Sequence, residues 1–188
     1  MSVYMESKKI IAILGLPGSG KTEVIEYLMK RYNWPKVYFG DVTFDEMKKR
    51  NLAINEQNER MVREELREKY GMDYYAEQVY KKINGLKNDK IILLESLYGW
   101  GEYKFLKNKF ENSLFTIAIY ASPEMRHRRL KHRKIRPLSR EQAKSRDYAQ
   151  IENLHQGGPI AMADFTIINE GAVKELRQSV DKIIKKII

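Results

Sequence analysis

Five short apolar runs along the chain predict the strands of a sheet. Each run is almost continuously apolar, which is typical of strands covered on both faces of a parallel sheet. We predict strands over residues 9–14, 36–39, 91–94, 114–120 and 165–168. Apolar residues at helical spacing follow the first strand, over residues 22–31, and fill the C-terminal segment 173–187. Strands that alternate with helices predict an α/β three-layer sandwich, with a five-stranded parallel sheet and helices on both faces.

Residues 42–88 lie between the second and third predicted strands and are too many for a bare loop. Their apolar positions fit two helical faces, of which the first should end at Gly71 and the second at Gly85. We therefore predict a helical insertion here, within a single domain of residues 1–188.

A second long segment, residues 134–160, follows the fourth predicted strand. Ser139 and Gln142 have the spacing of a capping box and predict the start of a helix. The pair Gly157-Gly158 is expected to stop that helix.

The sequence GLPGSGKT, residues 15–22, directly follows the first predicted strand and opens the first predicted helix. It matches the phosphate-binding P-loop, G-x-x-x-x-G-K-[ST], in the context that the motif requires. Glycines let the backbone curl so that several N–H groups point at one anion, and the helix start adds its positive dipole end. A lysine can follow the phosphates of ATP, and a hydroxyl can bind Mg²⁺. The predicted nucleotide-binding residues of this P-loop NTPase fold are Gly15, Gly18, Ser19, Gly20, Lys21 and Thr22.

The positive charge of the chain is concentrated in one segment. The whole sequence has a formal net charge of +10, and residues 126–146 hold ten lysines and arginines against one acidic residue, Glu141. The basicity is therefore local and not the basic coating that many nucleic-acid binders have. The chain has no cysteine, which excludes disulfides and cysteine-ligated metals. Because no apolar run is long enough to span a membrane, we expect a cytoplasmic protein with no membrane partner.

Two classes of P-loop protein fit the sequence less well than a small phosphotransferase. A GTPase would need Asn-Lys-x-Asp after a strand, whereas residues 108–111, Asn-Lys-Phe-Glu, precede the fourth predicted strand. A motor-type ATPase usually carries paired Asp-Glu after the third strand, where only Glu95 is present. A phosphotransferase needs an acceptor-binding insertion and a basic lid that closes over the phosphates and excludes water, and both long segments are suitably placed for these roles.

The chain resembles the nucleoside monophosphate kinase group of P-loop kinases. The resemblance lies in the glycine loop, in Phe39-Gly40-Asp41 after the second strand, and in RLKHR, residues 129–133, which opens the basic lid. Within that group it is most similar to dephospho-CoA kinases and archaeal-type adenylate-kinase-like ATPases, through the stretches REELREKYGMD, LSREQA and ADFTIINEG. This implies a transfer of the γ-phosphoryl group of ATP, with Mg²⁺, to a nucleotide-like acceptor such as a nucleoside monophosphate or dephospho-CoA.

The resemblance also implies roles for two carboxylates at strand ends. Asp41 is expected to bind the acceptor or to act as a general base, and its alternative role is the N-cap of a helix that starts at Val42. Glu95 is expected to hold Mg²⁺ together with Thr22, and its alternative role is that of an N-cap or surface carboxylate.

Arginines are expected to contact phosphates, because a guanidinium can bind them in a bidentate manner. Arg129 and Arg133 are the candidates for the phosphates of ATP and, with Lys21 and Asp41, for catalysis. Arg136 and Arg67 are the candidates for the acceptor. Since Arg67 and the nearby Arg63 lie among glutamates, a solvated salt-bridge face is the common alternative for both.

Residues after the third and fifth strands complete the predicted site. Tyr98 and Trp100 are expected to line the acceptor cleft, with core packing as the alternative. Asn169 and Gly171 lie where the resemblance implies contact with the adenine. The three histidines, His127, His132 and His155, show no metal-ligand spacing and are expected at the surface.

Two further functions stay open on the sequence. A nucleotide-binding regulatory ATPase that acts through a protein partner is one alternative, because Asp41 and Glu95 depart from the dephospho-CoA kinase pattern. Nucleic-acid binding is the least favoured, because residues 121–147 contain no aromatic side chain on which bases could stack. The acceptor and the oligomeric state, monomer or homodimer, are not determined by the sequence.

Overall fold

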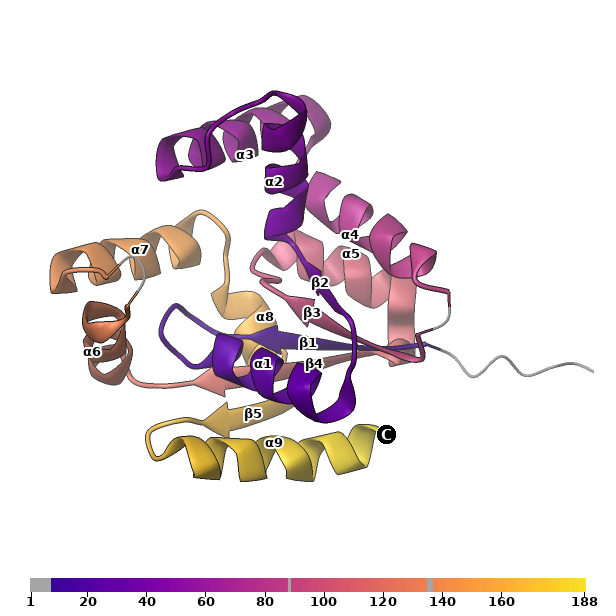
Figure 1. The fold of residues 1–188 in the computed structure, drawn as a ribbon, viewed down its shortest axis with the longest axis vertical. Helices are drawn as coiled ribbons and strands as arrows, with labels where there is room; N and C mark the ends of the chain where they lie inside the picture. The colour runs from indigo at the N-terminus through magenta and orange to yellow at the C-terminus, as the bar shows by residue number, and fades with distance from the viewer. Residues whose placement is uncertain (1–7, 88, 135–136) are drawn as a thin grey trace, which may run out of the picture.

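The computed structural model describes residues 8–87, 89–134 and 137–188. Its centre is a sheet of five parallel strands in the order β2-β3-β1-β4-β5 (Figure 1). The strands are β1 (Lys9–Leu14), β2 (Lys36–Tyr38), β3 (Ile91–Glu95), β4 (Leu114–Tyr120) and β5 (Phe165–Ile168). Their bounds agree with the five apolar runs to within one residue, and the predicted α/β fold is confirmed.

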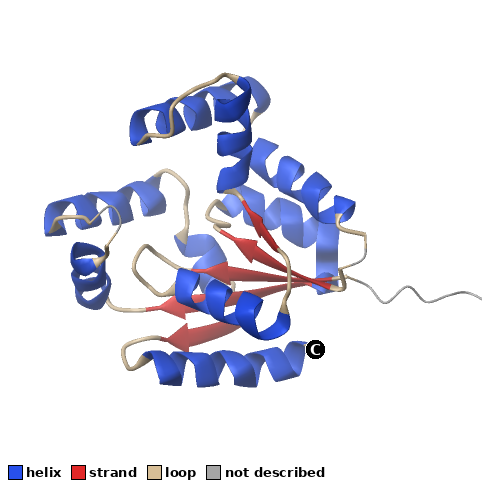
Figure 2. Ribbon diagram, in the orientation of Figure 1, coloured by secondary structure: helices blue, strands red, loops and turns tan. Residues whose placement is uncertain are grey.

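Helices cover both faces of this sheet (Figure 2). On one face lie α1 (Lys21–Tyr32) and α9 (Val173–Ile187), and on the other α4 (Tyr74–Gly85) and α5 (Trp100–Phe110). In the central strand β1, Ile11 and Ile13 pack with α1 and α9, whereas Ile10, Ala12 and Leu14 belong to the opposite core. Because both sets are buried, the strand is apolar at every position from Ile10 onward.

The first insertion folds as α2 (Gly40–Lys49), α3 (Glu56–Tyr70) and α4. Gly71 is the C-cap of α3, with a φ angle of 93°, and Gly85 is the last residue of α4, so both predicted helix ends are confirmed. The alternative role of Asp41 as an N-cap is wrong. Helix α2 begins at Gly40, two residues before the predicted start at Val42, with Phe39 in the cap position, which places Asp41 in its first turn near the positive end of the helix dipole.

The second insertion contains α7 (Arg140–Glu152) and α8 (Gly157–Ala161), and α6 (Pro123–His132) leads into it from β4. The predicted capping box is confirmed. The Ser139 N–H donates to Gln142 Oε1 at 2.8 Å, and the Gln142 N–H donates to Ser139 Oγ at 3.2 Å.

The Gly157-Gly158 pair does not stop α7, contrary to the prediction, because α7 already ends at Glu152 and the two glycines begin α8. Packing explains the second of them. A Cβ at Gly158 would lie 2.8 Å from the Trp100 ring, so α8 can approach α5 only without a side chain there.

Both insertions lie beyond the carboxyl edge of the sheet. Figure 1 shows α2 with α3, and α6 with α7, as two groups on the side to which the strand arrows point. This is the edge at which parallel α/β sheets bind their ligands. Within the described part of the chain, the helices are too short or too polar to cross a membrane.

Candidate active site

The loop between β1 and α1, residues 15–20, curls tightly at the carboxyl edge. Gly15, Gly18 and Gly20 have φ angles of 138°, 78° and 109°, in the left-handed region that side chains rarely adopt. Neighbouring backbone also approaches this loop closely. A Cβ on Gly15 would lie 2.4 Å from the Ile119 carbonyl oxygen, and one on Gly18 would lie 2.6 Å from the Arg126 carbonyl oxygen. Conformation and packing therefore both require glycine here.

Lys21 is the first residue of α1 and brings the positive charge to this loop. Its Nζ donates to the Leu16 carbonyl oxygen at 3.1 Å and lies 5.8 Å from the centre of the Tyr98 ring. Burial lowers the pKa of Lys21 from 10.5 to about 8, against the opposing effect of the Glu95 carboxylate. The ammonium is thus a half-buried cation whose charge its surroundings do not fully compensate.

The loop offers the donors that a polyphosphate needs. The buried Ser19 hydroxyl has no hydrogen-bond partner among the described residues. A ligand with several anionic oxygens would accept hydrogen bonds from the N–H groups of the curled backbone and would compensate the Lys21 ammonium. The residues present therefore fit the phosphates of a nucleotide.

The predicted magnesium ligands lie beside the same loop. Thr22 is exposed in the first turn of α1, and Glu95 ends β3, the strand next to β1. The Glu95 carboxylate forms an ion pair with Lys36, with Nζ and Oε2 2.7 Å apart. Hydroxyl and carboxylate oxygens suit Mg²⁺, which usually takes few protein ligands beside substrate phosphates. The described residues contain no group of three or more His, Cys, Asp or Glu side chains that could hold a metal ion by themselves.

We expect the affinity for ATP–Mg²⁺ to fall as the pH rises above about 8. The phosphates attract the protonated Lys21 ammonium, which loses its proton near that pH in the free protein, so the loss can approach about tenfold per pH unit. Calorimetric titration with a non-hydrolysable ATP analogue would measure it. The Lys21→Arg variant keeps its charge throughout, and an equal fall in that variant would show that another group is responsible.

Asn169 joins the end of β5 to the glycine loop. Its Nδ2 donates to the Ser19 carbonyl oxygen at 2.7 Å, and its N–H donates to the Tyr120 carbonyl oxygen at 2.7 Å. Arg129 Nη2 in turn donates to the Asn169 carbonyl oxygen at 2.9 Å. The structure therefore brings Arg129 and Asn169 together beside the loop. Gly171 lies two residues beyond Asn169, where a Cβ would collide with the carboxylate of Glu175.

Arg126 begins the basic segment but is a buried residue, only 3% exposed. Its guanidinium makes a bidentate pair with Asp147 of α7 at 2.7 and 2.9 Å, and it donates to the Pro17 carbonyl oxygen at 3.2 Å. His127 Nε2 lies 2.8 Å from the same carboxylate. The expectation of a surface His127 is wrong. Its side chain is only 14% exposed, because the ring contacts Asp147 of α7.

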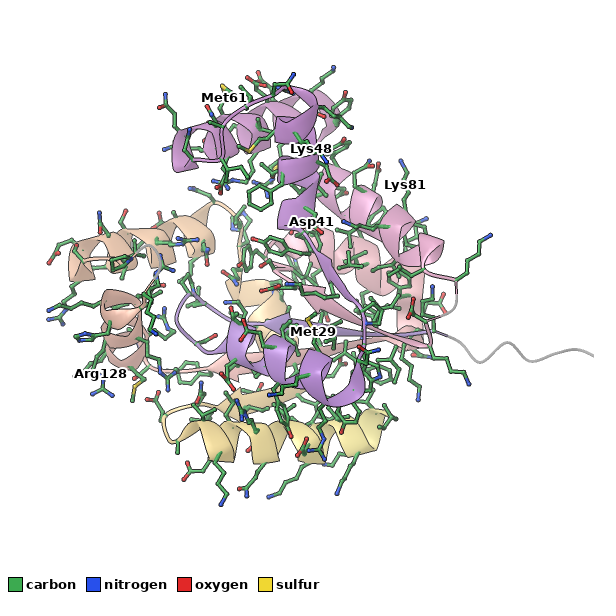
Figure 3. The ribbon with its side chains drawn as sticks, in the orientation of Figure 1. Met29, Asp41, Lys48, Met61, Lys81 and Arg128 are labelled. Carbon is green, nitrogen blue, oxygen red and sulfur yellow. The ribbon has the colours of Figure 1, made fainter. Side chains whose placement is uncertain are left out.

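The other arginines of the segment point in different directions. Arg146 of α7 lies close enough to the site for its charge to act on the pKa of both Lys21 and Tyr98. Arg128 points outward from α6, as Figure 3 shows. Its Nη2 donates to the Met125 sulfur. Arg133 is half-buried at the end of α6, and Arg136 lies outside the described residues.

Tyr98 lies beside the glycine loop, after the end of β3. Its ring lies near Lys21 Nζ, and its hydroxyl oxygen lies 2.9 Å from Ser96 Oγ. Burial raises the pKa of Tyr98, and the Glu95 and Glu102 carboxylates add to the rise. The hydroxyl is therefore neutral and available as a hydrogen-bond donor.

Arg67 reaches this site from α3. Its Nη2 donates to Glu102 Oε1 at 3.4 Å, and its guanidinium lies 4.9 Å from the centre of the Tyr75 ring. Its buried Nε has no partner among the described residues. Burial raises the pKa of Glu102, although the Gly99 N–H donates to that carboxylate at 2.9 Å. Arg67 thus packs into the protein with one donor unused, and it does not lie on a solvated salt-bridge face.

The other two predicted acceptor residues have partners of their own. Asp41, labelled at the base of α2 in Figure 3, accepts a hydrogen bond from Lys82 Nζ of α4 at 2.8 Å. Trp100 stacks on Tyr103, with ring centres 5.3 Å apart, and packs over Gly158. These are the contacts of a packing residue, which was the alternative for Trp100.

Comparison with known proteins identifies the family. A model described as an AAA domain matches residues 11–153. UPF0200 protein TK1334 of Thermococcus kodakarensis is 30% identical over 183 residues, covering 95% of this chain and 98% of the relative. The chain belongs to the AAA domain family and to the UPF0200 proteins. UPF0200 protein MJ1399 of Methanocaldococcus jannaschii is 33% identical over 182 residues, covering 95% and 90% of the two chains.

Solved structures of low identity share the fold of this UPF0200 chain. TT1252 from Thermus thermophilus is 19% identical, with a TM-score of 0.63 and coverage of 96% and 98% of the two chains. A shikimate kinase from Acinetobacter baumannii in complex with shikimate is also 19% identical, with a TM-score of 0.58 and coverage of 96% and 95%. The chain therefore has the α/β P-loop, kinase-like fold of these structures.

Three residues of the UPF0200 site escaped the sequence interpretation. Arg126 was grouped with the other basic residues, since no local pattern separates a buried arginine from exposed ones. One feature of the sequence could have indicated Asp147: it is an acidic residue directly after Arg146, at the end of the basic segment. Ser96 has a φ angle of 69° directly after β3, an uncommon conformation for a residue with a side chain, and nothing in the sequence marks it.

Proposed function

We propose that this protein transfers the γ-phosphoryl group of ATP, in the presence of Mg²⁺, to a small nucleotide-like acceptor. The observation that carries the proposal is a chain of contacts: Tyr98 lies beside Lys21, and Glu102, which accepts from the N–H of the adjacent Gly99, also accepts from Arg67. It connects the phosphate-binding loop with a buried, unused arginine donor in the helical insertion. Hydrolysis of ATP alone would not need this second anion-binding position.

The donor side of the reaction would be organised by the glycine loop and the basic segment. When bound, ATP supplies the γ-phosphoryl group, and Mg²⁺ would be held by Thr22 and Glu95. Phosphoryl transfer depends chiefly on positioning and on neutralising negative charge, which Lys21, Arg129 and Arg146 can provide. Arg133 is a further candidate for this role. Asn169 and Gly171 would contact the adenine at the end of β5.

The geometry favours a phosphate as the accepting group. A ribose hydroxyl, as in dephospho-CoA, needs a base, whereas a phosphate is already ionised. The Asp41 carboxylate is engaged by Lys82, and Arg67 suits a phosphate because its guanidinium can bind two oxygens. In the transfer, an acceptor phosphate oxygen forms a bond to the γ-phosphorus while the bond to the bridging oxygen of ADP breaks. A nucleoside monophosphate is therefore the acceptor class that we favour.

An acceptor panel with labelled ATP tests this function. We expect label in the product with at least one nucleoside monophosphate, and no label transfer to any nucleotide, nucleoside or dephospho-CoA would reject the proposal. Arg67→Ala should raise the acceptor KM by about 10- to 100-fold, the loss of one charged hydrogen-bonding group, and leave the ATP KM within about twofold. Arg60→Ala, on the same helix and paired with Glu64, is the matched control and should leave both constants unchanged.

A regulatory ATPase that acts through a protein partner is the second candidate. One observation favours it: the strand-end carboxylates Asp41 and Glu95 are both paired with lysines, Lys82 and Lys36, at 2.8 and 2.7 Å. Such a protein would release inorganic phosphate without any small acceptor. Measuring phosphate release and label transfer in the same samples separates the two functions.

A further inference from the structure

We propose that Arg126 and Asp147 are positioning residues that fix α7 on the glycine loop and thereby aim Arg146 at the bound phosphates. The inference rests on the proposed function, because the phosphates are those of ATP at this loop. Neither residue would touch the substrate itself.

A single buried guanidinium joins three parts of the fold. Arg126 Nε donates to the Ala121 carbonyl oxygen after β4 at 3.1 Å, and Nη1 donates to the Pro17 carbonyl oxygen of the glycine loop at 3.2 Å. Nη1 and Nη2 together hold the two carboxylate oxygens of Asp147 in α7. Because the guanidinium is planar and rigid, these bonds fix α7 in both distance and orientation relative to the loop.

Little apolar packing holds α7 in place. Its buried residues are Ala143, Asp147 and Gln150, of which only the small alanine is apolar. Its large apolar side chains, Tyr148 and Ile151, are 53% and 47% exposed. The Oε1 atom of Gln150 is buried without a partner among the described residues. The position of α7 therefore depends on the pair with Arg126 much more than on burial of apolar surface.

Arg146 directly precedes Asp147 on the same helix. Asp147 is held through Arg126 to the Pro17 carbonyl oxygen of the glycine loop, so α7 meets that loop one residue away from Arg146. Among the described residues no hydrogen bond or ion pair engages it. The placement of Arg146 is consequently set by the backbone of α7. The Arg126–Asp147 pair, which we call the anchor, lies one residue further along and determines where that backbone lies.

The test is a double-mutant cycle between the anchor and Arg146. Arg146→Ala should lower kcat by about 100-fold. Asp147→Asn should lower kcat by about tenfold and change the ATP KM by less than about threefold, and in the Arg146→Ala background it should change kcat by less than about twofold. Lys144→Ala, an exposed residue of α7, is the control and should leave kcat unchanged. An Asp147→Asn effect of the same size in both backgrounds would overturn the proposal.

The unpaired buried charge in Asp147→Asn can itself weaken folding, so a second variant is needed. Arg126→Met combined with Asp147→Leu replaces the pair by apolar side chains of similar volume, which often restores stability. We expect this variant to melt near the parent temperature and still to show the tenfold loss of kcat. Parent-like kcat in this folded variant would overturn the positioning role.

A readout that needs no catalysis separates this inference from the proposed function. Trypsin should cleave α7 of the nucleotide-free Asp147→Asn protein, after Arg140, Lys144 or Arg146, at least about fivefold faster than in the parent, because a released helix opens more often. Cleavage after Arg60 of α3 should be unchanged. Equal cleavage of α7 in both proteins would refute the anchor, whereas faster cleavage in a protein without phosphoryl transfer would refute the proposed function alone.

Discussion

Lys21→Met is expected to stabilise the nucleotide-free protein while it removes ATP binding. In the folded protein burial lowers the pKa of Lys21 to about 8, against 10.5 for an ordinary lysine. The unfolded chain therefore binds this proton more tightly, and the group opposes folding below about pH 8. Methionine has a similar length without the charge, so we expect a gain of about 1–3 kcal/mol in the free energy of unfolding at pH 7. ATP-dependent turnover should fall by about 10²- to 10³-fold.

Urea unfolding at two pH values measures the stability part of this prediction. The penalty from Lys21 disappears as the pH rises from about 8 to about 10.5, so the advantage of the methionine variant should shrink over that range. Lys30→Met, at an exposed position of the same helix, should change stability by less than about 0.5 kcal/mol at either pH. A methionine variant that is less stable than the parent, or that binds the ATP analogue equally well, would contradict the role given to Lys21.

Gly15→Ala is expected to destabilise the protein strongly and to abolish nucleotide binding. Gly15 combines a φ angle of 138° with a carbonyl oxygen, that of Ile119, only 2.4 Å from the position of a Cβ. The Ile119 carbonyl belongs to the backbone of β4, next to the central strand β1, so it cannot move cheaply. Strain and overpacking together should cost about 2–5 kcal/mol.

Gly71→Ala is the matched control for that substitution. Gly71 also has a positive φ angle, 93°, but no atom lies within 4 Å of the Cβ position. It should cost only the conformational strain, about 1–2 kcal/mol, with ATP affinity unchanged. The difference between the two variants isolates the close approach at Gly15. Equal losses of stability would show that the contact with Ile119 is unimportant.

The fold was predictable because the three inner strands, β1, β3 and β4, are covered on both faces. The ends of the continuous apolar runs mark the ends of the strands. Because the glycine loop directly follows the run of β1, its position at the carboxyl edge of the sheet was predictable. A helix start that no side chain caps leaves no local signal in the sequence. Helix α2 begins at Gly40 with Phe39 in the cap position and no side-chain cap hydrogen bond, and the first carboxylate of the segment, Asp41, lies two residues after the cap.

The site was predictable only where its chemistry is local in sequence. The glycine loop is one contiguous motif, and its residues are the ones that the fold assembles. The contact between Arg126 and Asp147 joins residues 21 positions apart, and that between Arg67 and Glu102 joins residues 35 positions apart. Both depend on how helices pack, which periodicity alone cannot specify. Charge patterns therefore revealed a basic segment but not which arginine is buried.

The hydrogen bond from Asn169 to the Ser19 carbonyl oxygen spans 150 positions of the chain. During synthesis the glycine loop is made long before β5, so the hydrogen bond from Asn169 cannot yet form. Contacts between residues so far apart in sequence also form late in folding, because long segments must first be brought together. Chains released before residue 165 would contain the whole motif and every lid arginine, yet lack the strand that braces the loop. Loss of the last 24 residues by early termination or proteolysis should thus be as damaging to nucleotide binding as a lesion in the motif itself.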